Sequence, residues 1–195
     1  MTPDELLTTT RTVRKRLDLD RPVDLEVVQD CLRIALQAPN GGNRQRWRWI
    51  VVADAEQRAA LAALYLKAAR TYFATSNAET KVRESAEYLA ENLHRVPVFV
   101  IPCLELPELP AGNQAGIWAS ILPATWSYML AARTRGLGTA WTTLHLNYER
   151  EAAEILGLPE TVRQAALIPT AYTLGTDFKP ARREALEDVL HLDRW

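Results

Sequence analysis

The sequence predicts an α+β fold in which helices cover a small sheet. Three observations lead to this prediction. Helical hydrophobic spacing recurs in about five segments, and capping residues precede several of them. About four short apolar runs lie between these segments, and proline or glycine bounds them as it bounds β-strands. The chain has no internal repeat, low-complexity tract or linker, so we expect residues 1–195 to form a single domain.

The N-terminal half of the chain carries the start signals of four helices. A helix begins well where a side chain can accept hydrogen bonds from the free N–H groups of its first turn. Thr2 and Glu5 flank Pro3 in the pattern of a capping box. The predicted helices begin after Thr2, extend from Asp24 to Pro39 and from Asp54 to Tyr72, and cover residues 78–93.

The C-terminal half contains the most apolar segment of the chain, residues 116–135. Apolar residues would lie on all faces of a helix formed by this segment, which predicts a buried central helix. Pro123 either bends this helix or sets its start. Asn147 is predicted to cap a further short helix that ends near Gly157.

The predicted strands are short. The run at residues 96–102 has a proline near each end, which indicates strand boundaries rather than a long central strand. Residues 104–115 contain two prolines and a glycine and are expected to form a loop or lid. The terminal residues alternate apolar and polar, as a strand does. We therefore predict extended segments over residues 50–52, 96–102, 139–143, 165–175 and 189–195.

Composition excludes several classes of protein. The net charge of −1 gives no general attraction to nucleic acid or to an anionic membrane. Cys31 and Cys103 are too few for a disulfide framework, and the three histidines lie far from both in sequence, so no metal site is expected. No apolar leader and no run of membrane-spanning length is present, and we expect a soluble cytoplasmic protein.

A loop rich in amides and glycines, residues 38–49, is the most informative segment of the chain, and we call it the amide loop. Its glycines allow a ligand to approach the backbone closely. Asn43 and Gln45 each carry donors and an acceptor, which suit a planar heterocycle with carbonyls and ring nitrogens. The alternative is an ordinary polar connection between a helix and a strand.

Two basic clusters lie almost a chain length apart. Arg11, Arg14, Lys15 and Arg16 place four cations within six residues, which suits a phosphate dianion, although a solvated helix end would look similar. The second cluster, residues 179–183, could equally serve solubility. Between them, residues 136–143 begin Gly-Leu-Gly, which fits a glycine turn after a helix and lacks the pattern of a dinucleotide fingerprint.

In this order, these features resemble the nitroreductase family of flavin-dependent oxidoreductases. Residues 11–18 are similar to the family's Arg-Arg-Ser-Val-Arg-x-Phe-Asp, and residues 38–47 to its Ala-Pro-Ser-x-x-Asn-x-Gln-Pro-Trp. Residues 131–141 resemble Leu-Ala-Ala-x-x-x-Gly-Leu-Gly-Thr-x-Trp, and residues 156–189 resemble its C-terminal part. The resemblance extends over essentially the whole chain.

The resemblance implies a mainly antiparallel sheet, FMN bound at the interface of a homodimer, and a C-terminal segment that joins the partner's sheet. By position, Arg11 and Lys15 would hold the phosphate with Arg182 and Arg183. The other implied cofactor contacts are Thr12 and Val13 near the ribityl chain and ring, Pro39, Asn40, Gly41, Asn43 and Gln45 from the partner subunit, and Trp141, Thr142 and Thr143 on the N5 side. Val13 and Arg46 stand where the family has Ser and Pro, which would tune flavin potential or pocket access.

The resemblance also implies the chemistry. NAD(P)H would pass a hydride to FMN N5, and a small acceptor such as a nitroaromatic or quinone would then take it in a ping-pong scheme. No side chain is expected to act as a catalytic acid, base or nucleophile. His145 follows the Trp141–Thr143 segment and is expected to be structural. The alternatives are a flavin store or sensor without turnover, or a same-fold enzyme for reductive dehalogenation, ene reduction or deazaflavin-dependent reduction.

Overall fold

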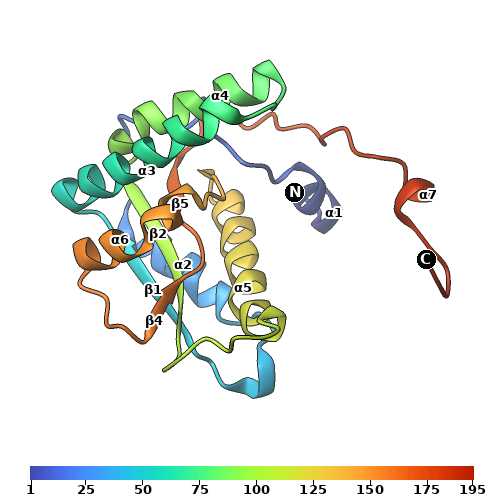
Figure 1. Ribbon diagram of the computed structural model, residues 1–195. Helices are drawn as coiled ribbons and strands as arrows, with labels where there is room; N and C mark the ends of the chain where they lie inside the picture. The colour runs from blue at the N-terminus through green and yellow to red at the C-terminus, as the bar shows by residue number, and fades with distance from the viewer.

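Five strands form one antiparallel sheet in the structure, a computed structural model that describes residues 1–195 (Figure 1). The central strand, β2 (Val98–Glu105), pairs with β1 (Trp47–Val52) along one edge. Along its other edge it pairs with β4 (Val162–Gln164) and with β5 (Ile168–Tyr172). β3 (Leu137–Thr139) pairs with β5, so the main order is β1-β2-β5-β3.

The structure has seven α-helices beside this sheet of five strands, and the predicted α+β fold is confirmed. None of them combines the length and the apolar character that a membrane-spanning helix needs. The helices are α1 (Pro3–Thr9), α2 (Leu25–Ala35), α3 (Ala55–Thr75), α4 (Thr80–Asn92), α5 (Ala115–Thr134), α6 (Glu149–Leu156) and α7 (Leu186–Val189).

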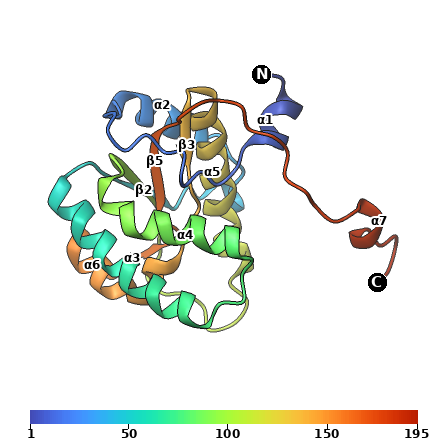
Figure 2. The ribbon, with the colours of Figure 1, turned by 90° about the horizontal axis from the view of Figure 1, so that it is seen from above.

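The side chains of β2 alternate between two apolar cores, one on each face of the sheet. Phe99, Ile101 and Cys103 are buried in the core that α3, α4 and α6 cover. Val98 and Val100 are buried on the opposite side, under α2 and α5. Figures 1 and 2 show these two groups of helices on either side of the strands. Because a strand with both faces covered is apolar throughout, β2 appears in the sequence as a continuous apolar run.

Pro102 lies inside β2, so the prediction that it ends the strand is wrong. It stands opposite Trp49 in the ladder. A proline removes one donor from a ladder but keeps its carbonyl. That carbonyl accepts a hydrogen bond of 2.8 Å from Ala165 N, where the chain passes between β4 and β5. The strand therefore continues to Glu105, and only residues 106–114 form the predicted loop.

The helix starts agree with the sequence except at one position. The capping box of Thr2 and Glu5 is present, and Asp24 and Asp54 each accept a backbone N–H of the first turn. Asn147 is not a cap: it lies inside the 3₁₀ turn Leu144–Tyr148, and α6 begins after Tyr148. A capping side chain is a local signal, and here the preceding turn displaces the helix start.

Further along the chain, α5 runs through Pro123 without starting there. Gly157 ends α6 at a φ of +64°, as predicted. The extended segment predicted over residues 165–175 contains β5, whereas β4 precedes it and was not predicted.

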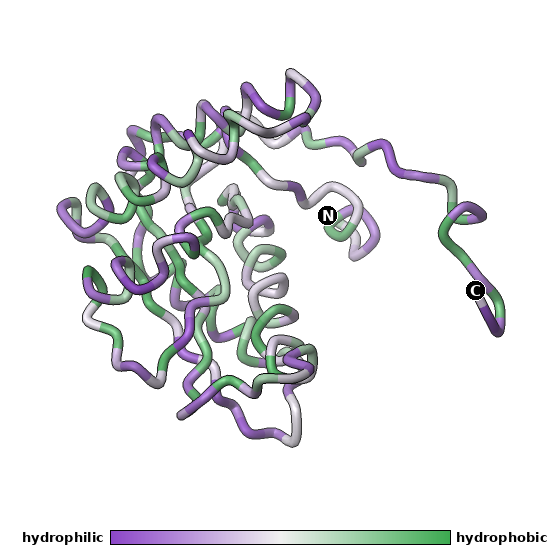
Figure 3. The backbone as a smooth tube through the Cα atoms, viewed as in Figure 1, coloured by the Kyte–Doolittle hydropathy of each residue, from purple (hydrophilic) through white to green (hydrophobic).

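The chain beyond residue 179 leaves the rest of the molecule (Figures 1 and 2). We call residues 180–195 the C-terminal arm. Figure 3 shows apolar and hydrophilic stretches alternating along it. Its large apolar side chains are exposed in the single chain, with Leu192 at 77% and Trp195 at 99%. Residues 186–189 form α7 and no strand follows, so pairing of the arm with a partner's sheet stays a prediction.

Candidate functional site

A cation-rich pocket of about 550 Å³ lies where residues 11–18, which we call the N-terminal segment, meet α4 and residues 177–179, just before the C-terminal arm. Its only acid, Asp177, forms an ion pair with Arg16 at 2.7 Å, and this hydrogen bond lowers the pKa of the carboxyl. We call this site the basic pocket. Its lining residues are Arg11, Thr12, Val13, Arg14, Lys15, Arg16, Lys81, Val82, Ser85, Asp177, Phe178 and Lys179.

The N-terminal segment reaches this position by joining the sheet. Val13 N donates to Thr139 O at 2.8 Å, and Asp18 N donates to Tyr172 O at 2.8 Å. The Val13 side chain is buried in the core. Leu17 is buried as well, and the three cations between these two anchors, Arg14, Lys15 and Arg16, line the pocket.

Gly138 permits this close approach. A Cβ there would lie 2.6 Å from Thr173 and 3.1 Å from both Leu17 and Val13. Gly136, two residues earlier, has a φ of +75° and follows the end of α5. The Gly-Leu-Gly sequence therefore serves a turn and a tight packing contact, as the structural alternative for this segment predicts.

Phe178 holds the segment that precedes the C-terminal arm against the pocket. Its ring lies between two guanidinium groups, with Arg16 at 4.3 Å and Arg133 at 4.4 Å from the centroid. Arg133 also donates to Thr176 O at 3.0 Å, and Arg16 to Leu174 O at 2.9 Å. These contacts deliver the next residue, Lys179, to the pocket, where its carbonyl accepts from Arg11 Nη1 at 3.1 Å.

The amide loop adopts an unusual backbone that its own side chains support. Asn40 Oδ1 accepts from Gln45 N at 3.1 Å, and Asn43 Oδ1 accepts from Gln45 Nε2 at 3.1 Å. Gly42, Asn43 and Gln45 all have positive φ, of 60°, 52° and 50°. A left-handed glutamine is uncommon and costs free energy, so the loop is held in a specific shape. Gly41 N donates to Ser120 Oγ at 3.1 Å and anchors the loop on α5.

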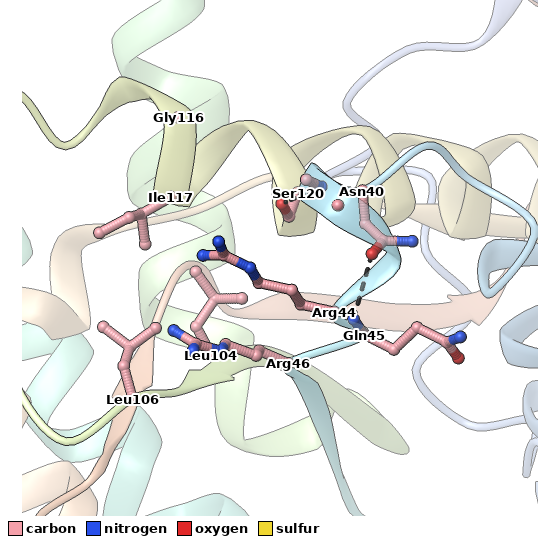
Figure 4. A pocket seen from close by; sticks show the side chains of 11 residues that line it. Asn40, Arg44, Gln45, Arg46, Leu104, Leu106, Gly116, Ile117 and Ser120 are labelled. Atoms are coloured by element: carbon pink, nitrogen blue, oxygen red, sulfur yellow. Dashed lines mark hydrogen bonds between the residues drawn. The ribbon is translucent and has the colours of Figure 1, made fainter.

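A second cavity, of about 300 Å³, lies between the amide loop, the end of β2 and the start of α5. Figure 4 shows the side chains of Arg44 and Arg46 extending into it, while the Gln45 amide points away from both. We call it the loop cavity. Its lining residues are Asn40, Gly41, Gly42, Arg44, Gln45, Arg46, Leu104, Leu106, Gly116, Ile117 and Ser120.

The sequence-predicted site residues fall into separate groups in the single chain. Arg11, Thr12, Val13 and Lys15 line the basic pocket, and Asn40, Gly41 and Gln45 line the loop cavity with Pro39 and Asn43 in the same loop. Arg182 and Arg183 lie in the arm, beside a hollow of their own, and the structure does not bring them to the basic pocket.

The segment from Trp141 to Thr143 lines neither the basic pocket nor the loop cavity. Thr142 is buried, and its hydroxyl donates to Leu167 O at 2.6 Å, so the hydrogen of this hydroxyl is already used within the protein. Trp141 is half-buried against the core under α2 and α5, and Thr143 is exposed.

Eight lining residues were not among the predicted cofactor contacts: Arg14, Arg16, Lys81, Val82, Ser85, Asp177, Phe178 and Lys179. Lys81 and Ser85 are four residues apart on α4, a spacing that puts two side chains on one helix face. Neither residue belongs to a motif, because only the packing of α4 beside the N-terminal segment brings them here. Lys179 belongs to the second basic cluster, and its charge was the available signal.

Comparison with known proteins gives a consistent family. The chain matches the model of the nitroreductase family over residues 7–172. A protein of Archaeoglobus fulgidus with the provisional name NADH dehydrogenase/NAD(P)H nitroreductase is 26% identical over 98% of this chain and 97% of its own length. The 5,6-dimethylbenzimidazole synthase of Rhodospirillum rubrum is 31% identical over 63% of this chain and 61% of the synthase.

Solved structures share the fold. Iodotyrosine deiodinase bound to FMN and 3-iodo-L-tyrosine has a TM-score of 0.75 at 21% identity, over 98% of this chain and 99% of that one. The FMN and NADPH-dependent nitroreductase NfnB of Sphigopyxis sp. strain HMH has a TM-score of 0.75 at 19% identity, over the whole of both chains. Because the family match extends over residues 7–172 of the 195, the chain belongs to the nitroreductase family and is an oxidoreductase.

Proposed function

We propose that the protein is a homodimeric FMN-dependent oxidoreductase that uses NAD(P)H to reduce a small acceptor such as a nitroaromatic or quinone. The observation that carries the proposal is the basic pocket, whose donor set fits a flavin phosphate. Six of its lining residues are cations, and its one acid is already paired. When bound, FMN supplies the hydride chemistry, and the protein supplies orientation, electrostatics and exclusion of water.

Arg11, Lys15 and Lys179 are the residues we assign to the phosphate. Arg11 keeps donors free, because its contact with Lys179 O uses only Nη1. Lys15 lies 4.0 Å from Glu84, a loose pair that a phosphate dianion would outcompete. Thr12 and Val13 would lie along the ribityl chain, and Val13 would do so through its backbone because its side chain is buried.

The amide loop is assigned to the flavin of the partner subunit. Asn43 Oδ1 and Gln45 Nε2 are bonded to each other, which orients both amides and leaves Asn43 Nδ2 free to donate. Donors aimed at the carbonyl oxygens of the ring would stabilise negative charge that develops there during reduction. Pro39, Asn40 and Gly41 would form the backbone wall beside them, and Trp141, Thr142 and Thr143 would face the N5 side.

The C-terminal arm supports the dimer in this proposal. Five of its apolar side chains are exposed in the single chain, which is costly in water unless a partner covers them. Crossing to a second copy would bury them, and it would carry Arg182 and Arg183 toward a phosphate. The exposed side chains are Leu186, Val189, Leu190, Leu192 and Trp195.

A same-fold enzyme with different chemistry is the second candidate. The family match is compatible with it, because the chain is similar both to an NAD(P)H nitroreductase and to 5,6-dimethylbenzimidazole synthase. The basic pocket and the amide loop would bind flavin in either case, so the two candidates differ in the acceptor.

The purified protein should be yellow, with about one FMN per chain. Under anaerobic conditions NADH or NADPH should bleach the colour, and a nitroaromatic or quinone should restore it. A yellow protein that neither pyridine nucleotide bleaches would refute the proposed donor and favour a flavin store or the second candidate. A colourless protein that does not take up added FMN would refute the cofactor itself.

A further inference from the structure

We propose that the loop cavity is a binding site for a small organic anion, a carboxylate carried on an apolar body. Arg44 and Arg46 provide its charge, and both extend into it from the same side (Figure 4). None of the lining residues is acidic. Two guanidinium groups in one concave site, with no negative charge among them, favour an anion that can accept from both.

Neither guanidinium is engaged by the protein itself. No hydrogen bond or ion pair joins the side chain of Arg44 or Arg46 to another residue, whereas Arg48, the second residue of β1, forms an ion pair with Glu105. Glu105 lies next to Arg46, since its N–H donates to Arg46 O at 2.8 Å, yet its carboxylate is taken by Arg48. Arg48 is thus neutralised within β1, while Arg44 and Arg46, in the loop before the strand, remain free.

Further donors face the same cavity. Ser120 Oγ accepts from Gly41 N, so the hydroxyl hydrogen remains available to a ligand. Gly116 and Ile117 belong to the first turn of α5, a helix of 20 residues whose N-terminal end adds positive potential.

The remaining wall determines the rest of the ligand. Leu104, Leu106 and Ile117 line the cavity together with the cations. Inorganic phosphate would leave these side chains unused, while a carboxylate on a ring or short alkyl body would contact them. A volume of about 300 Å³ suits a molecule of that size.

The site has a structural link to the amide loop. Arg44 lies between Asn43 and Gln45, so an anion held by Arg44 would restrain the two amides that the proposed function assigns to the flavin. The anion could therefore be the carboxylate of the acceptor or a separate effector. Binding itself requires neither flavin nor turnover, so the inference stands apart from the proposed function.

Benzoate is the probe, and benzyl alcohol is its neutral match. In the ¹⁵N-labelled full-length protein, benzoate should shift the amide resonances of Gly41, Gly42 and Ile117, and those of Lys81 and Ser85 in the basic pocket should stay in place. Arg44→Gln/Arg46→Gln should weaken benzoate binding by about tenfold or more, because two charge-assisted contacts are lost. Benzyl alcohol, which carries no charge, should bind the wild-type protein no more tightly than benzoate binds the double variant.

The matched control is Arg150→Gln/Arg163→Gln, which removes the same charge from a different cavity. Equal weakening by the two double variants, or shifts confined to the basic pocket, would overturn the proposal. Where the protein turns over a neutral nitroaromatic, competitive inhibition by benzoate identifies the anion as part of the acceptor, and non-competitive inhibition identifies an effector. If the protein shows no turnover, the proposed function is wrong. The resonance shifts would still show whether benzoate binds in the loop cavity.

Discussion

At the scale of single residues, the basic pocket combines cations that are fixed in place with cations that are free to bind. Arg16 is fixed by Leu174 O, Asp177 and the Phe178 ring. Arg14 is half-buried, and desolvation lowers its pKa from the usual value. Lys81 and Lys179 form no ion pair in the single chain. In the proposed function, the fixed arginines shape the site, and the free lysines with Arg11 would meet the phosphate.

Removal of Arg11 and Lys179 together should therefore weaken flavin binding without unfolding the protein. Charge-assisted contacts contribute about 1.5–3 kcal/mol each, and solvent exposure reduces this, so Arg11→Ala/Lys179→Ala should raise the dissociation constant of FMN by about 100-fold. Fluorescence titration of the apoprotein measures it. Arg150→Ala, on the exposed face of α6, is the control and should change nothing. Unchanged affinity in the double variant would remove the phosphate from this pocket.

His145 makes a second prediction at this scale. The ring is buried, and neither nitrogen has a hydrogen-bond partner. Burial lowers its pKa from 6.5 to about 4, against a smaller opposing effect of Gln164. The unfolded chain therefore takes up a proton before the folded one as pH falls, and stability present above pH 6.5 is lost progressively toward about pH 4.

We expect this loss to reach about 3 kcal/mol at the low end of that range. Denaturant unfolding between pH 6.5 and about 5 isolates the effect, because most carboxylates titrate lower. An NMR titration of the His145 ring gives its pKa directly. A ring that titrates near 6.5, with stability constant over this interval, would show that the histidine is solvated.

At the scale of elements, the backbone of the amide loop is strained, and this conformation holds the amide side chains in position. Gln45 has a φ of 50°, which a glycine would adopt without cost. Gln45→Gly should therefore leave the free energy of unfolding unchanged or raise it by up to about 1 kcal/mol, while FMN binding or the flavin potential changes. Thermal unfolding and a potentiometric titration measure the two effects. A clear loss of stability would mean that Gln45 only shapes the turn.

The junction between the N-terminal segment and β3 is the element on which the basic pocket depends. Gly138→Ala would force a Cβ to within 2.6 Å of Thr173. We expect it to destabilise the protein by about 2 kcal/mol and to weaken FMN binding as residues 12–17 move. Gly112→Ala, where no atom lies within 4 Å, is the control and should be close to neutral. Chemical denaturation of both variants tests this, and equal stabilities would contradict it.

At the scale of the whole molecule, local signals predicted the helices better than the strands. The caps at Thr2, Asp24 and Asp54 depend on groups within three residues, and all were predicted correctly. β4 and the extension of β2 past Pro102 depend on pairing between residues about 60 positions apart, which periodicity does not report. The two glycines of the 136–138 turn were identified, but only packing shows why the second cannot carry a side chain.

The residues of the candidate site also divide into those that local sequence signals predict and those that only packing brings to the site. Arg11, Lys15 and the amide loop belong to local motifs and were predicted from the sequence. Lys81 reaches the basic pocket only through the packing of α4, and Lys179 through the stacking of Phe178 between two arginines. Cation–π stacking across 45 residues of sequence, as between Arg133 and Phe178, leaves no periodic trace.

The central claim is that each flavin site takes its phosphate cations from one chain and its amides from the other. Two inactive variants, Arg11→Ala and Asn43→Leu/Gln45→Leu, test it when their subunits are exchanged. A mixed dimer would then have one doubly damaged site and one intact site, so equal mixing should restore about a quarter of the wild-type activity. No recovery, with mixed dimers demonstrated by native mass spectrometry, would place both sets of contacts in the same chain and contradict the account.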